Sequence, residues 1–360
     1  AKDPLFFING FCWILEPREG ESEAEAGILP FNTWVHQDPV IAALHKYFGI
    51  RHILLLKSRA QGASWILAAM LVWGFIFLKH KLFGLASKDE QSADAANRPG
   101  SLGWKIDFLI RMLPSWMRPP GLDPNEKKNR SLSQHSWENV LAHNYISAEA
   151  ATPNTGRSDR YTVFGGDEAA FFVPQHGRAA LANLLQTTNC VWWFSTPNGM
   201  DDAFYDKCRD PGPFLTCILD WKDNPVQNPG LYTYKNGKPD FIDKDYDWQA
   251  NFPEGYNHVP DGETRSPWFD RKCQEMNNDM LLIKRELCME FAGSIGRPFP
   301  QYALERMEEF TSKALHTGTV HFDFDYPEDV SEFEWIEGEG YKFDIWQPIV
   351  NGFLPEGKYF

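Results

Sequence analysis

The segment between residues 52 and 78 constrains the fold of this chain more than any other. Residues 52–56 form a short apolar run with the length and composition of a buried strand. A loop of polar and small residues follows at 57–62, and a long apolar run typical of a buried helix begins at about Ala63. Strand, loop and helix in this order begin a βαβ unit. We therefore expect an α/β fold with a mainly parallel central sheet flanked by helices.

The loop has features that suit phosphate binding. Its sequence is Lys57-Ser58-Arg59-Ala60-Gln61-Gly62-Ala63-Ser64. The N-terminus of the following helix favours anions, small residues let the backbone approach them, and the Ser64 hydroxyl can ligate Mg²⁺. The pattern departs twice from G-x-x-x-x-G-K-[ST], because Ser58 stands at the first glycine and Ala63 at the lysine. Lys57 can supply the cation from the end of the strand. The alternative is an ordinary strand-to-helix turn with a surface lysine.

Two carboxylates follow another apolar run. Asp167 and Glu168 come shortly after residues 161–165, which have strand composition. We expect this strand to lie next to the strand that precedes the loop. Asp167 would then hold Mg²⁺ through its water shell, and Glu168 would orient and deprotonate the water that attacks the γ-phosphate. The alternative is a pair of acidic residues that caps a helix N-terminus.

Two further segments offer groups for the same chemistry. Arg157 lies in a polar loop before the acidic pair, where it could neutralise transition-state charge in its own subunit or in a neighbour's. A plain surface arginine is the alternative. A third strand-like run, 190–194, ends in Ser195, Thr196 and Asn198, whose hydroxyl and amide groups could sense the γ-phosphate and pass its loss to a moving lid.

Composition divides the chain into four parts. We expect an N-terminal arm at 1–30, a nucleotide-binding core at 31–223, an irregular insertion with a helical lid or linker subdomain at 224–299, and a linker or the beginning of another domain at 300–360. Apolar spacing predicts helices at 28–48, 90–97, 104–113, 175–185 and 268–291, and strands at 81–87, 140–149, 319–324 and 341–346.

Charge, cysteines and hydropathy exclude several classes of protein. The formal net charge of −14 has the wrong sign for a protein that coats nucleic acid, so any DNA contact must be local. The candidate cations for such a contact are Lys79, Lys81, Lys127, Lys128 and Arg130. The six cysteines form no C-x-x-C pair, which argues against a zinc site or a disulfide framework. The apolar run at 65–78 is shorter than the roughly 20 residues that a membrane span requires, and we expect a cytoplasmic protein.

Taken together, these motifs resemble those of the large terminase subunits of tailed bacteriophages, from about residue 31 to residue 299. A variant P-loop of that family carries its lysine at the front, as Lys57 does here, and Arg59 matches its loop arginine. Gln61 stands one place away from the family's usual Arg-Gln pair. Gln37 resembles the glutamine that recognises adenine upstream of the P-loop. The other matches are Arg157 to the arginine before the acidic strand, Asp167 and Glu168 to the Walker B pair, and Ser195, Thr196 and Pro197 to the coupling motif.

The resemblance implies a P-loop NTPase of the ASCE type with a small lid or linker subdomain, which hydrolyses ATP with Mg²⁺ to move double-stranded viral DNA into a procapsid. It implies as partners the DNA, the portal protein, the small terminase subunit and further copies of the chain in a ring, with no membrane, in the cytoplasm of the infected bacterium. The implied ATP-binding residues are Gln37, Lys57, Ser58, Arg59, Gln61, Gly62, Ala63 and Ser64. The implied metal ligands are Ser64 and Asp167, the catalytic residues Glu168 and Arg157, and the coupling residues Ser195, Thr196 and Asn198.

Family membership would also imply a C-terminal nuclease, and residues 300–360 would be its linker or its truncated beginning. We expect the nuclease domain itself to be missing and therefore expect no DNA cleavage by this chain. Asp323 and Asp325 fit an acidic strand surface better than a metal site. Two other functions stay open. One is a helicase-like P-loop ATPase of another lineage, although such enzymes normally keep the loop lysine. The other is a degenerate P-loop scaffold that binds portal or capsid protein without hydrolysis, which Ala63 keeps possible.

Overall fold

The computed structural model describes residues 3–16, 27–95, 97–122 and 128–291, and beyond them the backbone of β13 (His316–Tyr326), β14 (Asp329–Glu337) and β15 (Phe343–Ile345). The chain divides into two compact units, Ala1–Arg297 and Pro298–Phe360. The second unit contains an antiparallel sheet in the order β14-β13-β15. The side chains of Asp323 and Asp325 lie outside the described residues, as do Lys127 and most of residues 300–360, the predicted linker or beginning of another domain.

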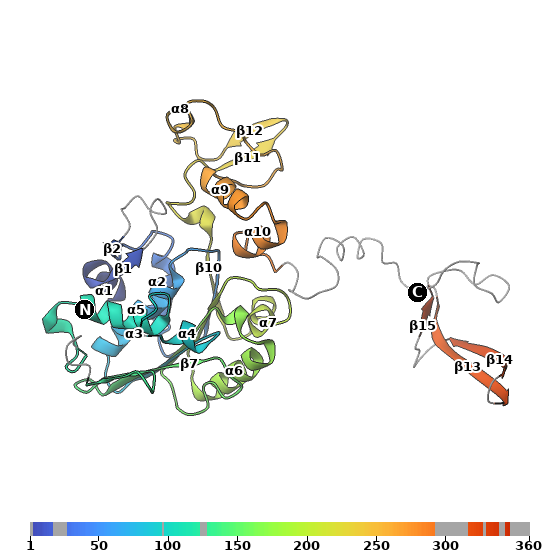
Figure 1. Ribbon diagram of the computed structural model, residues 1–360, viewed down its shortest axis with the longest axis horizontal. Coiled ribbons are helices and arrows are strands. Elements are labelled where there is room, and N and C mark those ends of the chain that lie inside the picture. Colours follow the sequence, from blue (N-terminus) through green and yellow to red (C-terminus); the bar gives the residue numbers. More distant parts are fainter. Residues whose placement is uncertain are drawn as a thin grey trace. The chain divides into compact units, whose positions relative to one another are not determined.

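An eight-stranded sheet forms the centre of the first unit (Figure 1). Its order is β10-β3-β9-β8-β4-β7-β6-β5, in which β10 to β7 run parallel and β6 and β5 are antiparallel. The strands are β3 (Ile53–Lys57), β4 (Leu82–Ser87), β5 (Arg130–Ser131), β6 (Ser136–Asn139), β7 (Asn144–Ala150), β8 (Val163–Asp167), β9 (Val191–Ser195) and β10 (Leu215–Leu219). This mainly parallel sheet confirms the predicted fold class.

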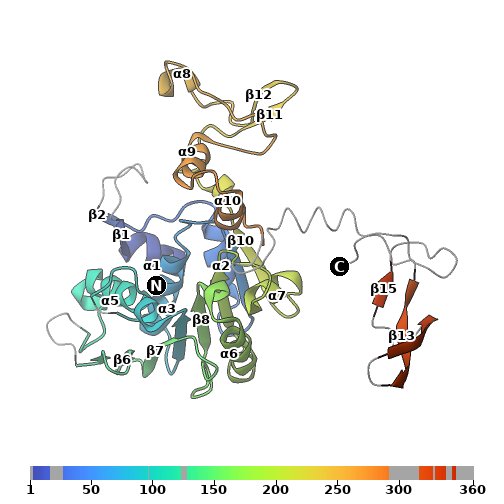
Figure 2. The same cartoon turned by 45° about the vertical axis from the view of Figure 1, so that its right-hand side comes forward.

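Helices cover both faces of the sheet (Figures 1 and 2). One face carries α1 (Pro4–Phe11), α2 (Asp38–Lys46), α3 (Ala63–Phe77) and α5 (Leu102–Met112). The other carries α6 (Pro174–Thr187), α7 (Ala203–Arg209) and the short helix η2 (Ala169–Phe171). The remaining elements of this part are the antiparallel pair β1 (Trp13–Glu16) and β2 (Gly27–Pro30), and the short helices α4 (Glu90–Ala93), η1 (Ser115–Met117) and η3 (Trp221–Asp223).

The strands are apolar on both sides because both faces are buried. Ile53 and Leu55 belong to the core beneath α3, whereas Leu54 belongs to the core beneath α6. Trp192 and Trp193 of β9 divide between the two cores in the same way. Successive side chains of a strand point to opposite faces, so a strand covered on both sides reads as a continuous apolar run. The run at 52–56 has this origin.

Helix α3 is buried on nearly all sides, as the sequence predicts. Its buried residues extend from Ala63 to Phe75 and include small and large apolar side chains on every face. No helix in the described ranges is long and apolar enough to cross a membrane. Phe7 and Ile8, within the predicted N-terminal arm, are fully buried in the same core cluster.

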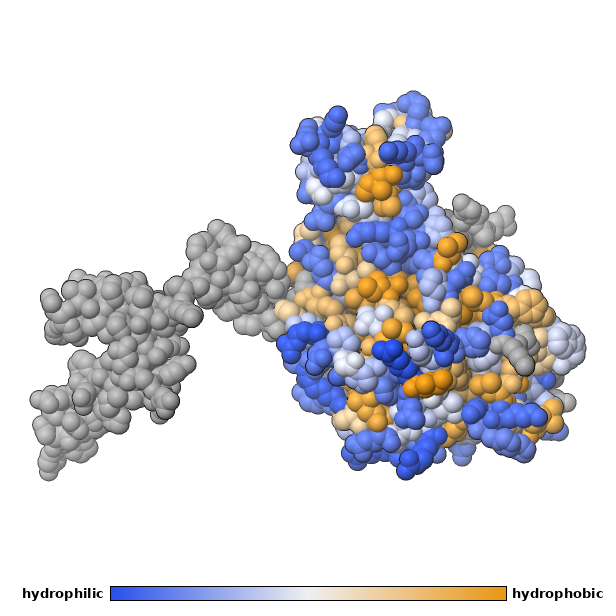
Figure 3. All heavy atoms as spheres, turned by 180° about the vertical axis from the view of Figure 1, so that it is seen from behind, coloured by the Kyte–Doolittle hydropathy of each residue, from blue (hydrophilic) through white to orange (hydrophobic). Residues whose placement is uncertain are grey.

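A smaller subdomain follows β10. It contains the hairpin β11 (Tyr232–Lys235) and β12 (Lys238–Phe241), then α8 (Trp248–Asn251), α9 (Pro267–Glu275) and α10 (Met280–Glu286). This subdomain has a small core of its own, in which Trp221 stacks with Trp268 and Phe269 of α9. On the face seen in Figure 3, polar and apolar residues are interspersed. The large exposed apolar side chains include Val35, in a turn, and Ile218, on β10. Scattered exposure of this kind is ordinary for a folded protein.

Four predictions of local structure are wrong. The expected helix at 28–48 is confined to α2, because residues 27–30 pair as a strand with β1. The helix at 90–97 ends at Ala93. The helix at 268–291 is two helices, because Asn277 and Asn278 take positive φ angles of 54° and 55° that break it. The irregular insertion contains a hairpin built around the buried Tyr232.

Candidate nucleotide-binding site

The predicted phosphate loop lies at the carboxyl edge of the sheet. Strand β3 ends at Lys57, and α3 begins at Ala63 with Gly62 as its N-terminal cap. Gly62 has a φ angle of 69°, and a Cβ atom there would lie 3.0 Å from Nε2 of Gln37. Glycine is thus required by both the backbone turn and the approach of Gln37. Gln37 is buried and donates from Nε2 to the carbonyl of Gln61 at 3.0 Å, so it braces the loop.

The acidic pair reaches this loop from β8. The expectation that β8 lies next to β3 is wrong, because β9 runs between them. The carboxyl ends of all three strands still share one edge, and long side chains span the gap. Ser64 Oγ donates to Asp167 Oδ2 at 2.6 Å, and Lys57 Nζ lies 3.4 Å from Glu168 Oε1. The fold therefore brings together the cation, the hydroxyl and both carboxylates that the sequence singled out.

The surroundings of Asp167 suit a divalent cation. The carboxylate is buried, and its Oδ1 atom has no hydrogen-bond partner within the described residues. Burial raises the pKa of Asp167, the Glu168 carboxylate raises it further, and Lys57 and the Ser64 hydroxyl act in the opposite direction. A buried carboxylate with an unpartnered oxygen beside a hydroxyl fits Mg²⁺, which takes few protein ligands and completes its shell with phosphate and water. Within the described ranges, no group of three or more His, Cys, Asp or Glu residues forms a metal site.

Two cavities adjoin the loop and share Arg59, Ser64 and Glu168. The larger, about 350 Å³, runs along the loop to Trp34. The smaller, about 190 Å³, contains Asp167 and lies at the end of β8. Together they form a groove lined on one side by the N-terminus of α3 and on the other by the acidic pair. Such a groove suits an extended anion whose far end meets a metal.

Three polar residues of the loop bond within the protein. Ser58 donates from its backbone N–H to the Leu219 carbonyl of β10 at 2.9 Å. Arg59 forms a 2.9 Å ion pair with Glu286 of α10. Gln61 donates to Gln227 at 2.7 Å in the segment that follows β10. The loop is therefore tied to the smaller subdomain at two points.

The predicted coupling residues connect β9 to the segment after Glu168. Ser195 Oγ accepts a hydrogen bond from the backbone N–H of Ala170 at 3.1 Å. Asn198 donates to the carbonyl of Ala170 at 3.1 Å. The buried Thr196 hydroxyl has no partner within the described residues. Ala170 is two residues after Glu168, so a movement of Glu168 would also displace the residues that follow β9.

Arg157 lies apart from these groups. It is exposed in the connection between β7 and β8, and its Nε atom donates to Asn183 of α6 at 3.2 Å. It lines neither cavity. The prediction that Arg130 is a surface cation available to DNA is wrong, because its side chain is buried between Asp94 and Asp107.

Sequence reasoning missed the residues that other elements bring to the groove. Lys105 of α5 lines the larger cavity, Lys88 lines the smaller one, and Gln227 and Glu286 bind the loop. The apolar run that forms β10 was a usable signal for Gln227, because residues that follow a parallel strand lie at the same edge as the loop. Nothing local marks Lys105.

Taken together, the strand order, the loop between β3 and α3 and the acidic pair at the end of β8 define the P-loop NTPase class of α/β fold. Solved structures similar to this chain include large terminases of bacteriophages. The HK97 large terminase matches at 13% identity with a TM-score of 0.46, covering 90% of this chain and 62% of that protein. The large terminase of a thermophilic bacteriophage matches at 14% identity with a TM-score of 0.39, covering 54% of this chain and 47% of that protein. The chain thus spans less than two thirds of the length of either terminase.

The ATPase domain of the Thermus phage P74-26 large terminase matches at 13% identity with a TM-score of 0.42, covering 70% of this chain and 92% of that domain. The terminase of the thermophilic bacteriophage has also been solved in complex with ATP-gamma-S and with ADP. No protein-family model and no curated protein matches the chain.

Proposed function

We propose that this chain binds and hydrolyses ATP at the groove between α3 and β8, and that it is the ATPase part of a terminase large subunit that moves double-stranded DNA into a procapsid. The observation that carries the proposal is the meeting of Lys57, Ser64, Asp167 and Glu168 at one edge of the sheet. These groups come from strands and a helix far apart in sequence. A cation, a metal-binding pair and a base in one groove are the parts that phosphoryl transfer needs.

Each group then has a role. The N-terminus of α3 and Lys57 bind the phosphates, and Ser64 and Asp167 hold Mg²⁺. Mg²⁺, when bound, neutralises charge on the β- and γ-phosphate oxygens. Glu168 orients the attacking water and accepts its proton, and the ion pair with Lys57 keeps its carboxylate at the groove. Gln37 holds the loop in shape through its bond to Gln61.

The remaining roles follow from position. Arg59 is paired with Glu286 and Gln61 with Gln227. A change in the conformation of the loop would therefore be transmitted to the smaller subdomain through these two contacts. Arg157 lies on the exposed side of α6, which suits action in a neighbouring subunit's site within a ring. DNA, the portal protein and the small terminase subunit are the proposed partners.

Nucleotide binding with and without the loop cation tests the proposal. Wild type should bind Mg·ATP, Lys57→Ala should bind it about ten- to hundredfold more weakly because it loses a charge-assisted phosphate contact, and the exposed Lys79→Ala should bind like wild type. Glu168→Gln should bind ATP but hydrolyse it about 10²- to 10⁴-fold more slowly. No binding by wild type would favour a degenerate scaffold. Hydrolysis at the wild-type rate by Glu168→Gln would show that the assigned base is wrong.

A further inference from the structure

The groove contains a cation that belongs to none of the loop or strand motifs. Lys105 lies on α5 and lines the larger cavity together with Gly62, Ala63 and Ser64 at the N-terminus of α3. Its Nζ atom donates to the carbonyl of Gly100 at 2.8 Å, and Gly100 lines the smaller cavity. Lys105 therefore stands where the two cavities meet.

The charge of Lys105 lies within electrostatic range of the acidic pair. Burial lowers the pKa of Lys105, and the carboxylates of Asp167 and Glu168 act in the opposite direction, so both are close enough to influence it. Its ammonium group also lies 5.6 Å from the centre of the Trp65 ring, next to Ser64. Lys105 thus lines the same cavity as Ser64 and Glu168, beside the first turn of α3.

Other cations of the groove are already engaged or lie at its surface. Lys57 is paired with Glu168, and Arg59 with Glu286 while its side chain stays 60% exposed. Lys88 is exposed, and its ammonium group lies over the Phe171 ring. At position 63, where the common P-loop pattern has its lysine, this chain has alanine. A triphosphate in the groove carries more negative charge than Lys57 can neutralise while it also holds Glu168.

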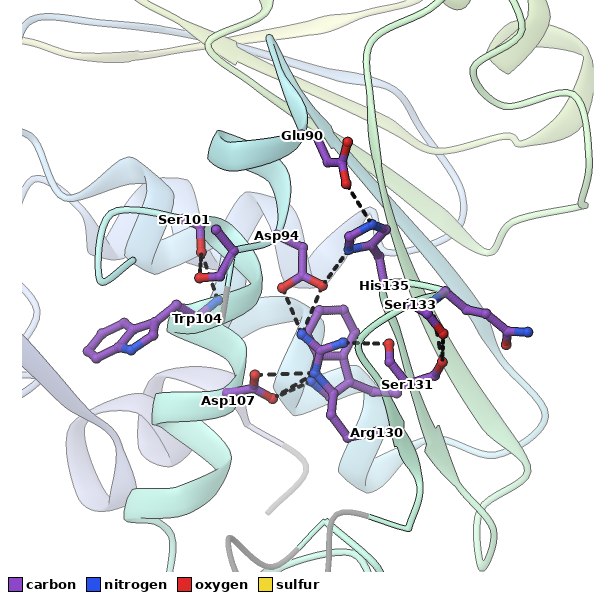
Figure 4. Close-up of polar contacts among 12 residues, drawn as sticks. Glu90, Asp94, Ser101, Trp104, Asp107, Arg130, Ser131, Ser133 and His135 are labelled. Atoms are coloured by element: carbon purple, nitrogen blue, oxygen red, sulfur yellow. Dashed lines mark hydrogen bonds and ion pairs between the residues drawn. The ribbon is translucent and has the colours of Figure 1, made fainter. Parts of the chain in front are cut away.

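Buried ion pairs anchor helix α5, from which the Lys105 side chain extends into the groove. Asp94 and Asp107 point at the Arg130 guanidinium from two sides (Figure 4), and Asp107 is two residues along α5 from Lys105. Gly103 lets Asp94 approach the helix, since a Cβ atom there would collide with the Asp94 carboxylate. A pre-positioned charge costs little to organise when the ligand binds.

We propose that Lys105 is a phosphate-binding residue that contacts the γ-phosphate of the nucleoside triphosphate and takes over the charge missing at Ala63. The inference rests on the proposed ATPase function and adds a residue that makes the site prefer triphosphate to diphosphate. A lysine that merely capped the Gly100 carbonyl would support α5 and leave nucleotide preference unchanged.

Affinity for a non-hydrolysable ATP analogue and for ADP, each with Mg²⁺, separates these roles. Lys105→Met should bind the analogue about ten- to hundredfold more weakly and ADP within about threefold of wild type. Lys105→Arg should recover much of the preference because it keeps the charge. Arg111→Met is the matched control, since it removes an exposed cation from the same helix, and should leave both affinities unchanged. An unchanged ratio of the two affinities in Lys105→Met would overturn the inference.

Acylation of lysines gives a second test. It uses only the wild-type protein, so it does not depend on whether a variant folds. With the ATP analogue and Mg²⁺, Lys105 and Lys57 should become protected, whereas the exposed Lys79 should react as before. Protection of Lys57 without Lys105 would overturn the inference and leave the proposed function standing. Protection of neither, together with no nucleotide binding by wild type, would overturn both.

Discussion

Replacement of Arg130 by methionine should destabilise the first unit strongly. The guanidinium contacts both oxygens of Asp94 at 2.7 and 2.8 Å and those of Asp107 at 3.1 and 3.2 Å, and it lies 3.8 Å from the centre of the Trp137 ring. The side chains of Arg130 and Asp94 are only 4% and 2% exposed. Figure 4 shows the two carboxylates converging on it.

The expected magnitude follows from what the variant leaves behind. Among the described residues, Asp94 would keep the His135 side chain as its partner, at 3.0 Å, and its carboxylate would stay buried. Asp107 would keep the Trp137 indole, at 2.6 Å, and it is 35% exposed. Removing one partner of a buried ion pair costs about 3–5 kcal/mol, chiefly because the other charge stays in a poorly solvating environment. We assign most of that cost to Asp94.

The chain offers a matched control on its surface. Arg178 contacts Asp201 at 3.1 Å and Asp206 at 3.0 Å, similar distances, but its side chain is 44% exposed. Exposed pairs contribute roughly 0.2–1 kcal/mol, because water and salt screen them. Arg178→Met should therefore lower the free energy of unfolding by about 1 kcal/mol or less. Burial is the main difference between the two sites, and Arg130 additionally lies over the Trp137 ring and donates to the Ser131 carbonyl.

Urea unfolding monitored by tryptophan fluorescence measures both variants, with the shift in midpoint converted through the wild-type slope. The double variant Arg130→Met with Asp94→Asn should regain a large part of the loss, because the buried charge is gone. Equal losses for Arg130→Met and Arg178→Met would refute the argument from burial. A double variant no more stable than Arg130→Met would refute the assignment of the cost to Asp94.

Two further predictions concern the proposed site. Asp167→Asn should abolish hydrolysis yet raise the melting temperature of the nucleotide-free protein at neutral pH. Burial raises the pKa of Asp167, so the folded chain holds that proton more tightly than the unfolded one, and wild type loses stability as pH rises above the ordinary carboxyl range. The gap between variant and wild type should thus grow as the pH rises from the ordinary carboxyl range toward neutrality, and a variant less stable than wild type at neutral pH would contradict this. Mixtures of Arg157→Ala with Glu168→Ala subunits should regain some ATPase activity if Arg157 acts in a neighbour's site, and no recovery at any ratio would place its action within one subunit.

The sequence alone was enough to predict the segment from β3 to α3 and the acidic end of β8. Apolar runs, a glycine turn and carboxylates after a strand are local patterns, and neighbouring residues along the chain decide them. The fold class was predicted from the order of strand, loop and helix in the same segment. The predicted helix at 28–48 failed because residues 27–30 pair with a separate strand, a contact that propensity does not record.

Only the tertiary structure decided what surrounds the loop. In the folded sheet, β9 lies between β3 and β8. Lys57 and Glu168 therefore meet through their long side chains and not because their strands are neighbours. Glu286 and Lys105 reach the groove from α10 and α5, two helices without a recognisable sequence motif. The tertiary structure also buried Arg130, which composition alone had placed at the surface. These outcomes depend on packing between segments far apart in sequence, whereas the motif itself depends on residues in a row.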